Sequence, residues 1–443
     1  MDIVVVGAGH TGLVTAACFA EMGNKVVCID QDEKAITRLQ QGELATQEPG
    51  LENLVRQNSM AGRLSFSSDW QTLAECQICI IAIGRPADVV GVTESAEIMG
   101  LLADIVRYCE GHTVIAIKST VMVGTADKVH AYLDANRRAG CSYEVVSNPE
   151  FIKEGAAVDD FMSPDRIIIG TECEESGRLL AQVYTSFTRT RDRMMFMGRR
   201  DAEFTKYAAT AMLATRISLM NELALMAESM DVDIENIRRG IGSDSRIGYS
   251  FIYPGCGYGG ARFSQDVRTL VASAETCGLD PQVLRAVEQR NKQQKNRLFE
   301  KLEMLFDNQL QGKVIAVWGL AYKPGVADMS ESSSIPLIQA LLQAGARVQV
   351  YDPVCDQAMA SQWFDNQMVE SGQLRFASHQ YDAVEAANAL VLVTEWKPFR
   401  QPDFIAIKKL LQTPVIVDGR NQYDPEALAQ QGFIYSGIGR SAG

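Results

Sequence analysis

The sequence lacks the features that would assign it to a membrane or to nucleic acid. No uncharged apolar run reaches the ~18–20 residues that a membrane-spanning helix needs. The sequence has fewer positive than negative residues: 42 lysines and arginines against 55 aspartates and glutamates, which gives a formal net charge of −13. This balance argues against nucleic acid or an anionic membrane as the main partner. The first residues contain no basic segment and no cleavage site, so we expect no secretory signal and a cytoplasmic location.

Disulfide and metal patterns are missing as well. The 10 cysteines are scattered along the chain, and several lie in apolar segments, which is typical of reduced thiols. Cys76 and Cys79 form a CxxC, but no second CxxC and no nearby histidine accompany it. We therefore interpret this pair as structural and predict no metal site.

Length and composition indicate a folded protein of several domains. At ~100–200 residues per domain, 443 residues correspond to two to four domains, each large enough for a sizeable core. Hydrophobic residues make up 47% and charged residues 22%, which is ordinary for a globular protein. We find no short-period repeat and no low-complexity linker.

The first thirty residues have the pattern of a β-strand, a helix and a second strand. Residues 2–6 are mostly apolar and β-branched, residues 13–20 are small and helix-like, and residues 25–30 form a strand that ends in Asp30. Strand-like runs recur at residues 78–83, 113–118, 143–147 and 166–170, with helix-like stretches between most of them. This alternation predicts an open parallel sheet wrapped by helices.

The rest of the chain divides into a helical centre and a second α/β region. Residues 202–230 contain neither glycine nor proline and predict one long helix, followed by a glycine-rich loop at residues 253–260. Strands are expected again at residues 313–320, 347–352, 389–394 and 415–418. We predict an α/β protein with two Rossmann-like, doubly wound domains joined by a long central helix and a helical dimerisation region. The boundaries are 1–200 for cofactor binding, 201–305 for dimerisation and 306–443 for substrate binding.

The turn after the first strand has the features of a dinucleotide site. Gly7, Gly9 and Gly12 form a GxGxxG motif between a strand and a helix. In this motif the first glycine permits the tight turn, the second lets the backbone approach a diphosphate, and the third allows close packing of helix and strand. Asp30 lies where a carboxylate binds the adenosine ribose and repels a 2′-phosphate, so we predict NAD as the cofactor. His10, inside the motif, is interpreted as a spectator.

Motifs throughout the chain resemble the UDP-glucose/GDP-mannose dehydrogenase family. They are residues 7–12 (GAGHTG), 118–120 (KST), 147–155 (SNPEFIKEG), 164–166 (PDR), 206–209 (KYAA), 221–222 (NE), 257–260 (GYGG), 319–324 (GLAYKP), 351–353 (YDP), 394–396 (TEW) and 418–421 (DGRN). The resemblance implies oxidation of the C6 hydroxymethyl group of a nucleotide sugar, such as UDP-glucose, to a carboxylate with two NAD. It also implies a homodimer, an N-terminal domain that holds NAD and a C-terminal domain that holds the nucleotide sugar.

The resemblance also assigns roles to individual residues. The catalytic positions are Thr120, Glu150, Glu154, Lys206 and Asp266, and the cofactor positions beyond the glycines and Asp30 are Lys34, Arg85, Thr120 and Glu154. The nucleotide-sugar positions are Lys206, Arg246, Tyr253, Gly259, Lys323 and Arg420. Glu150 and Glu154 share one face if residues 151–155 are helical, whereas in a loop Glu154 only caps a helix.

Four departures from the family pattern concern the predicted reaction centre. The family's nucleophilic cysteine corresponds to Arg262, which cannot form a thiohemiacetal. The family's oxyanion-stabilising asparagine corresponds to Thr210, a threonine near the cofactor to Arg85, and an arginine to Ser330. Cys256 is a possible substitute nucleophile, but a small residue in a tight loop is the simpler interpretation.

These departures leave three functions open. The first is an NAD-dependent oxidoreductase acting on the CH–OH group of a nucleotide sugar, with a slow or absent second oxidation. The second is a non-catalytic protein that binds NAD or a nucleotide sugar and regulates a relative. The third is a dehydrogenase of an acidic, uronate-bearing nucleotide sugar, in which Arg262 holds the carboxylate. We favour a structural role over this third function, in which Arg262 fills the pocket or pairs with Glu154 or Asp266, because several nearby acids could neutralise it.

Overall fold

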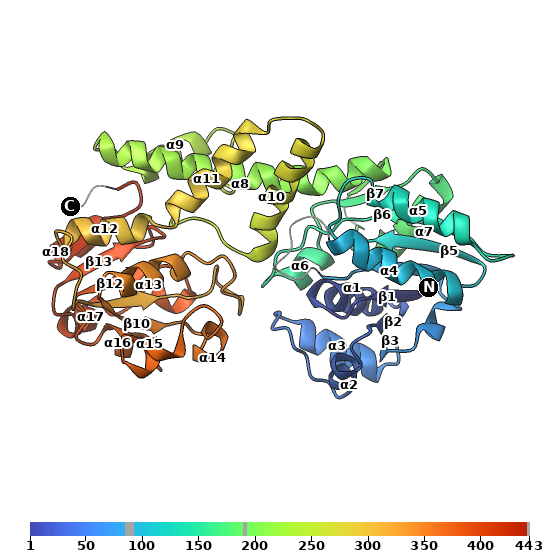
Figure 1. Cartoon of the computed structure of the whole chain (residues 1–443), viewed down its shortest axis with the longest axis horizontal. Coiled ribbons are helices and arrows are strands. Elements are labelled where there is room, and N and C mark those ends of the chain that lie inside the picture. The colour runs from blue at the N-terminus through green and yellow to red at the C-terminus, as the bar shows by residue number, and fades with distance from the viewer. Residues whose placement is uncertain (85–92, 189–192, 441–443) are drawn as a thin grey trace. The chain divides into compact units, whose positions relative to one another are not determined.

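The computed structural model describes residues 1–84, 93–188 and 193–440. The chain forms two compact units, Met1–Ala209 and Thr210–Gly443. Figure 1 follows the chain by colour from one unit to the other. The finer division at residues 200 and 305 stays a prediction.

Unit 1 contains a twisted sheet whose strand order is β3-β2-β1-β4-β5-β6-β7-β8 within the described residues. The strands are β1 (Asp2–Val6), β2 (Lys25–Ile29), β3 (Leu64–Ser67), β4 (Ile78–Ile81), β5 (His112–Ile117), β6 (Ser142–Ser147), β7 (Ile167–Gly170) and β8 (Met194–Met197). The first six follow the order of a doubly wound dinucleotide-binding fold, with the switch point between β1 and β4. All neighbouring pairs are parallel except β6 and β7, which meet in antiparallel orientation.

Helices cover both faces of this sheet. They are α1 (His10–Glu21), α2 (Glu33–Gln40), α3 (Leu51–Met60), α4 (Thr93–Tyr108), α5 (Thr125–Asn136), α6 (Ala157–Met162) and α7 (Glu174–Tyr184). One apolar core joins α1, α3, α6 and α7 to one face, and a second joins α4 and α5 to the other. Both cores are rich in valine and isoleucine, as a sheet buried on two faces requires. Cys76 and Cys79 are buried in the second core.

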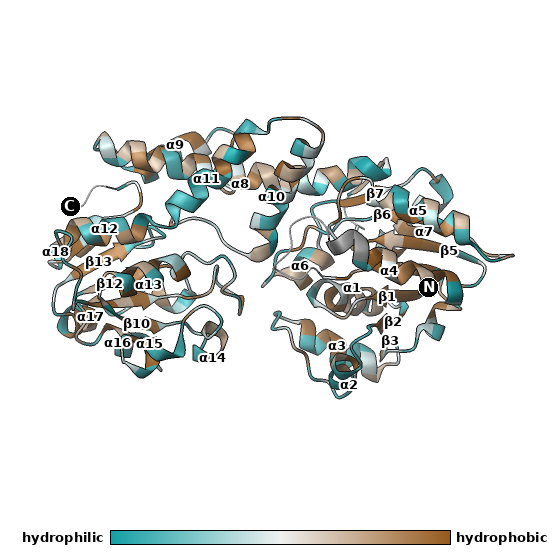
Figure 2. Ribbon diagram, viewed as in Figure 1, coloured by the Kyte–Doolittle hydropathy of each residue, from teal (hydrophilic) through white to brown (hydrophobic). Residues whose placement is uncertain are grey.

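Unit 2 repeats the same strand order in a smaller sheet, β11-β10-β9-β12-β13-β14, in which every pair is parallel. The strands are β9 (Val314–Trp318), β10 (Arg347–Tyr351), β11 (Leu374–Phe376), β12 (Ala389–Leu392), β13 (Val415–Asp418) and β14 (Ile434–Gly437). Its helices are α13 (Ser334–Gln343), α14 (Gln357–Ala360), α15 (Asn366–Glu370), α16 (Gln380–Val384), α17 (Phe404–Leu410) and α18 (Pro425–Gln430). The strands of both sheets are strongly hydrophobic in Figure 2.

The central part of the chain is helical, as predicted. It contains α8 (Arg199–Ser229), α9 (Ile234–Gly242), α10 (Ala261–Thr276), α11 (Gln282–Gln294) and α12 (Arg297–Leu305). Helix α8 has 31 residues and begins three residues before the expected start. The predicted α/β class with two doubly wound sheets and a long central helix is confirmed. Over the residues that are described, no helix combines the length and the apolar character that crossing a membrane requires.

Candidate functional site

The GxGxxG turn of unit 1 has the shape that a dinucleotide requires. Gly7 has a φ of 108°, and a Cβ atom on it would lie 2.6 Å from the carbonyl oxygen of Ala82, directly after β4. A Cβ on Gly12 would lie 1.8 Å from the carbonyl oxygen of Gly7, so helix α1 packs on the turn itself. A Cβ on Gly9, in contrast, would have no neighbour within 4 Å. The space in front of Gly9 is open for a diphosphate at the N-terminus of α1.

Asp30 follows β2 and closes the other side of this turn. Its Oδ2 accepts a hydrogen bond from the amide of Ala8 at 2.7 Å, and its Oδ1 accepts one from the amide of Asp32 at 3.0 Å. Each carboxylate oxygen has a second lone pair, so Asp30 retains acceptor capacity for the hydroxyls of a ribose. The turn and Asp30 therefore fit the adenosine and diphosphate of NAD.

The equivalent turn of unit 2 is closed to such a ligand. Asp352 follows β10 as Asp30 follows β2, but its Oδ2 accepts from the amides of Leu320 and Ala321 and from the indole Nε1 of Trp396, at 2.7, 3.1 and 2.9 Å. Its Oδ1 accepts from two further amides, at 2.9 Å each. With five donors on a buried carboxylate, Asp352 has little capacity left for a ribose. The turn of unit 2 is therefore not suited to the ribose of a dinucleotide, whereas the turn of unit 1 is.

Lys206 and Glu150 form a pair in unit 1. Lys206, on the second turn of α8, donates from Nζ to the backbone oxygen of Glu150 at 2.8 Å and lies 3.6 Å from its Oε1. Oε2 of Glu150 accepts from the amide of Ile152 at 2.7 Å, and the Lys206 ammonium lies 5.3 Å from the ring centre of Phe151. Both charged groups are largely buried, at 14% and 9% side-chain exposure, so their charges act with little screening. The structure thus brings together Lys206 and Glu150, two of the predicted site residues.

Thr120 lies beside Lys206 on the wall of a small pocket in unit 1. The pocket lies at the carboxyl ends of β5 and β6, and it is lined by Ile117, Ser119, Thr120, Val121, Ser147, Pro149, Glu203 and Lys206. Burial raises the pKa of Glu203, although the amides of Gly124 and Ala126 donate to its carboxylate at 2.6 and 2.8 Å. Glu203 therefore anchors the start of α5 to α8 and shapes the wall beside Thr120.

Glu154 lies in a turn and is not part of a helix. Residues 151–153 are irregular, and α6 begins only at Ala157, so the alternative in which Glu150 and Glu154 share a helical face is not realised. The loop that carries Glu154 is instead held by Glu48, whose carboxylate accepts from the amides of Gly155 and Ala157 at 2.8 Å each.

The glycine-rich loop of unit 2 packs tightly against the loop before α13. A Cβ on Gly259 would lie 2.5 Å from the carbonyl oxygen of Glu331, and one on Gly260 would lie 2.9 Å from the ring of Tyr322. Glu331 adopts a left-handed backbone with a φ of 56°. Burial raises the pKa of Glu331, but the hydrogen bond from Lys295 and the charge of Arg268 outweigh it and lower the pKa. The predicted site residue Gly259 is thus a close-approach position, where a side chain is excluded.

Arg420 follows β13 and is held against the same loop. Its Nε donates to the carbonyl oxygen of Val393 at 2.7 Å and lies 3.2 Å from Glu395 Oε2, while its Nη1 donates to the carbonyl oxygen of Gly257 at 3.3 Å. Cys256 lies behind this arginine with no exposed surface, and its thiol contacts the carbonyl oxygen of Val393 at 3.6 Å. Burial raises the pKa of Cys256, which keeps the thiol protonated and inert.

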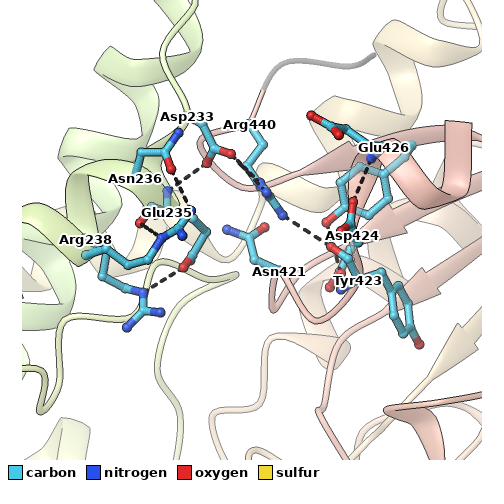
Figure 3. A network of polar contacts seen from close by, with 12 residues as sticks. Asp233, Glu235, Asn236, Arg238, Asn421, Tyr423, Asp424, Glu426 and Arg440 are labelled. Atoms are coloured by element: carbon cyan, nitrogen blue, oxygen red, sulfur yellow. Dashed lines mark hydrogen bonds and ion pairs between the residues drawn. The ribbon is translucent and has the colours of Figure 1, made fainter.

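The residues after Arg420 are fixed by a polar network at the end of unit 2. Asn421 has a φ of 51°, donates to the carbonyl oxygen of Ile438 and accepts from its amide, both at 2.8 Å. Arg440 reaches from the chain end to Asp233 at 2.9 Å and to the carbonyl oxygen of Tyr423 at 3.2 Å, as Figure 3 shows. This network supports the turn on which Arg420 is presented.

Arg262 and Asp266 occupy successive turns of α10 in unit 2. Arg262 is exposed, whereas Asp266 is 5% exposed and its Oδ2 accepts from the hydroxyl of Thr210 at 3.2 Å. Thr210, at the position of the family's asparagine, thus bonds to Asp266, and Arg262, at the position of the family's cysteine, precedes Asp266 by one turn of α10.

Other predicted residues lie at the surface of their unit. Arg246 forms an exposed ion pair with Asp244 at 2.6 Å, and Tyr253 is 58% exposed with Arg238 4.9 Å from its ring centre. Lys34 is exposed in the first turn of α2, and the Lys323 ammonium lies 5.6 Å from the ring centre of Tyr322. Arg85 lies outside the described residues.

Sequence reasoning did not find Glu48 and Glu203. Each holds two backbone amides that lie between 77 and 109 residues away along the chain. Neither glutamate belongs to a motif that predicts such a contact, and only the folded backbone brings the amides to them.

Comparison with known proteins identifies the family. Three models of the UDP-glucose/GDP-mannose dehydrogenase family match the chain: the NAD binding domain at residues 1–188, the central domain at residues 200–293 and the UDP binding domain at residues 316–425. The chain belongs to the UDP-glucose/GDP-mannose dehydrogenase family. The match to the family's NAD binding domain confirms NAD as the cofactor, and the match to its UDP binding domain confirms a nucleotide sugar as the partner.

Relatives match over almost the whole chain. A UDP-glucose 6-dehydrogenase of Pseudomonas aeruginosa is 48% identical over 444 residues, covering 99% of this chain and 98% of the relative. A UDP-glucose 6-dehydrogenase of Rhizobium meliloti is 38% identical over 446 residues, with 99% and 100% coverage. The structure of a UDP-glucose dehydrogenase from Pyrobaculum islandicum superposes with a TM-score of 0.87 at 29% identity, covering 99% of this chain and 98% of that one. This family member is thus an NAD-dependent oxidoreductase of nucleotide sugars.

Proposed function

We propose that the protein oxidises the C6 hydroxymethyl group of UDP-glucose or a close relative with NAD, and that its second oxidation is slow or absent. The observation that carries the first half is the Lys206–Glu150 pair, held in the same unit as the open GxGxxG turn. The observation that carries the second half is Arg262, at the position where the resemblance requires a nucleophilic cysteine.

In the first oxidation the alcohol loses a proton from oxygen and a hydride from C6, which gives an aldehyde. NAD held at the GxGxxG turn would supply the acceptor for that hydride. Glu150 accepts the proton directly or through water, and the Lys206 ammonium stabilises the negative charge that develops on the oxygen. Their contact at 3.6 Å holds the two groups side by side before substrate binds.

The second oxidation needs a tetrahedral adduct of the aldehyde, from which a second hydride leaves. A cysteine thiolate supplies that adduct in the predicted family mechanism, and hydrolysis of the thioester then gives the carboxylate. Arg262 has no nucleophilic atom, and the thiol of Cys256 is buried and bonded to a backbone oxygen. The remaining route is addition of water to the aldehyde, with Asp266 or Glu154 as the base, and we expect this route to be slow.

The nucleotide sugar is assigned to the residues of unit 2 that the resemblance names. Arg420 presents its guanidinium beside the glycine-rich loop, and Lys323 follows the turn after β9. Two cations are suited to the diphosphate of a nucleotide sugar. Gly259 lets the glycine-rich loop pack against the backbone of Glu331 and so keeps the proposed site in shape, and Arg246 and Tyr253 are additional proposed contacts.

The experiment is to supply the purified protein with UDP-glucose and excess NAD and to count the NADH formed per sugar consumed. We expect about one NADH per sugar and an aldehyde as the main product, with NADP as a poor substitute. Formation of the uronate with two NADH per sugar, at the ~1–10³ s⁻¹ typical of enzymes, would contradict the proposed impairment. Calorimetric binding of both ligands without any NADH would instead support a regulatory binding protein.

A second candidate is a dehydrogenase of an acidic nucleotide sugar. It is favoured by the exposure of Arg262 on the first turn of α10, because a guanidinium binds a carboxylate through two parallel hydrogen bonds. Under this hypothesis the substitution Arg262→Ala weakens binding of UDP-glucuronate more than binding of UDP-glucose. Equal effects on the two ligands would exclude it.

We also propose a homodimer formed along α8. Met212, Leu219 and Met226 follow each other on α8 at intervals of seven residues, and their exposures are 63%, 53% and 48%; Met230, just after the end of α8, is 71% exposed. This spacing places them along one side of a helix, and such a stripe of exposed apolar residues is typical of an interface. The double substitution Met212→Glu with Leu219→Glu should halve the mass measured by light scattering, and an unchanged mass would contradict the interface. The cytoplasmic location stays a prediction.

A further inference from the structure

His10, which sequence reasoning treats as a spectator, is bonded to a buried carboxylate. It is the first residue of α1 and lies inside the GxGxxG turn. Its Nε2 lies 2.8 Å from Glu48 Oε2, and the two side chains are 12% and 1% exposed. A contact of this length between buried groups is a charge-assisted hydrogen bond.

The other partners of Glu48 determine which atom carries the proton. Oε2 also accepts from the amide of Gly155, and Oε1 accepts from the amide of Ala157. Two backbone amides can only donate, so the carboxylate is the acceptor in both contacts. His10 therefore donates from Nε2, and Glu48 joins the cofactor turn to the loop that carries Glu154.

The second nitrogen of His10 has no hydrogen-bond partner among the residues that the structure describes, although it is buried. A buried polar atom without a partner costs roughly 1–3 kcal/mol, so such an atom indicates a ligand or a functional role. His10 belongs to the turn at which the NAD diphosphate is expected, and a Cβ on the neighbouring Gly9 would meet no atom within 4 Å.

We propose that His10 connects the NAD diphosphate to Glu48. Nδ1 donates to a diphosphate oxygen and Nε2 donates to the Glu48 carboxylate, so the imidazole ring lies between two anions. Through Glu48, the amides of Gly155 and Ala157 then follow the position of His10. Cofactor binding thereby sets the position of Glu154, and His10 acts as a cofactor-binding and positioning residue. This inference relies on NAD binding but not on which sugar is oxidised.

Two substitutions separate the roles of the two nitrogens. The amide nitrogen of glutamine reaches the place of Nε2, so His10→Gln keeps the contact with Glu48 and loses the contact with the diphosphate. The amide nitrogen of asparagine reaches the place of Nδ1, so His10→Asn has the opposite effect. His112→Gln is the matched control, because His112 lies at the exposed start of β5, where its Nδ1 is 2.8 Å from the hydroxyl oxygen of Ser142.

The first measurement is the binding of NAD and of ADP-ribose by calorimetry. ADP-ribose carries the diphosphate but cannot accept a hydride, so this readout does not depend on turnover. We expect His10→Gln to weaken both ligands about 10-fold or more, since a hydrogen bond to a charged group is worth roughly 1.5–3 kcal/mol. His10→Asn and the control should change neither dissociation constant by more than about threefold.

The second measurement is the steady-state rate with NAD and UDP-glucose. We expect His10→Asn to lower kcat with little change in the KM for NAD, and His10→Gln to raise that KM with little change in kcat. Unchanged ligand binding in His10→Gln would overturn the diphosphate contact. Equal losses of binding and of melting temperature in both variants would reduce His10 to a structural role and overturn the proposal. If the wild type binds ADP-ribose but makes no NADH, the dehydrogenase proposal fails while the binding test of His10 still decides this one.

Discussion

The two glycines that flank the cofactor turn should respond in opposite ways to an added methyl group. Gly9 has an extended backbone with a φ of −74°, which alanine adopts freely, and its Cβ would meet no atom within 4 Å. Gly12 has space for no Cβ, because the carbonyl oxygen of Gly7 would lie 1.8 Å away. Gly9→Ala therefore tests the approach of the cofactor, whereas Gly12→Ala tests the packing of α1 on the turn.

The magnitudes follow from these contacts. Overpacking against fixed backbone costs about 1–3 kcal/mol or more, and a helical glycine replaced by alanine regains about 1 kcal/mol of propensity. We place the net loss for Gly12→Ala near 2 kcal/mol, because backbone cannot move aside as a flexible side chain does. At roughly 2–4 °C per kcal/mol for a unit of this size, the melting temperature should fall by about 4–8 °C. Gly9→Ala should stay within about 0.5 kcal/mol of wild type.

The assay combines differential scanning calorimetry with titration of NAD. Gly9→Ala should keep its melting temperature but bind NAD at least about 10-fold more weakly, which corresponds to about 1.4 kcal/mol. Wild-type affinity in Gly9→Ala would refute the assignment of the diphosphate to this turn. A melting temperature that falls as far in Gly9→Ala as in Gly12→Ala would refute the open space in front of Gly9.

Three further predictions concern other parts of the structure. Lys206→Met should lower kcat about 100-fold or more, as for loss of an oxyanion-stabilising group, and should also lower the melting temperature, because it leaves the largely buried Glu150 carboxylate without its cation. Cys256→Ala should leave the ratio of NADH to sugar unchanged, because the thiol is buried and its pKa is raised by burial. If the wild type formed a second NADH and Cys256→Ala did not, Cys256 would be the nucleophile. Glu228 accepts from the amide of Gly439 and pairs with Arg297 and with Lys301 at 2.8 Å, so Glu228→Gln should cost about 3–5 kcal/mol in thermal unfolding at neutral pH. Burial raises the pKa of Glu228, but the hydrogen bond and the charge of Lys301 outweigh burial and lower the pKa. The stabilisation by Glu228 is therefore complete above the ordinary glutamate pKa of about 4.3. As the pH falls below that value, the difference in unfolding free energy between wild type and Glu228→Gln should disappear.

The sequence allows prediction of those features that depend on local pattern. The GxGxxG turn, Asp30 and the long glycine-free helix each have a signal within a few neighbouring residues, and the structure contains all of them. Strands β3, β8, β11 and β14 were not predicted. They have only three or four residues each, and β8 and β11 have little buried apolar surface to mark them.

Features that depend on long-range contacts could not be predicted in this way. Asp30 and Asp352 both follow the second strand of a βαβ unit, yet only the structure shows that five donors occupy Asp352. In the sequence Glu48 has no feature that separates it from other loop glutamates, and only the structure shows its contacts with His10 and with the amides of Gly155 and Ala157. The sequence thus locates the chemistry but not the contacts that fix its geometry.

The most direct test of the proposed function is the number of NADH molecules formed per UDP-glucose consumed, in the wild type and in Arg262→Cys. The account predicts about one for the wild type and a value that rises towards two in Arg262→Cys, since the substitution supplies the missing nucleophile. Two NADH per sugar in the wild type at an ordinary enzymatic rate, with no change in the variant, would contradict it.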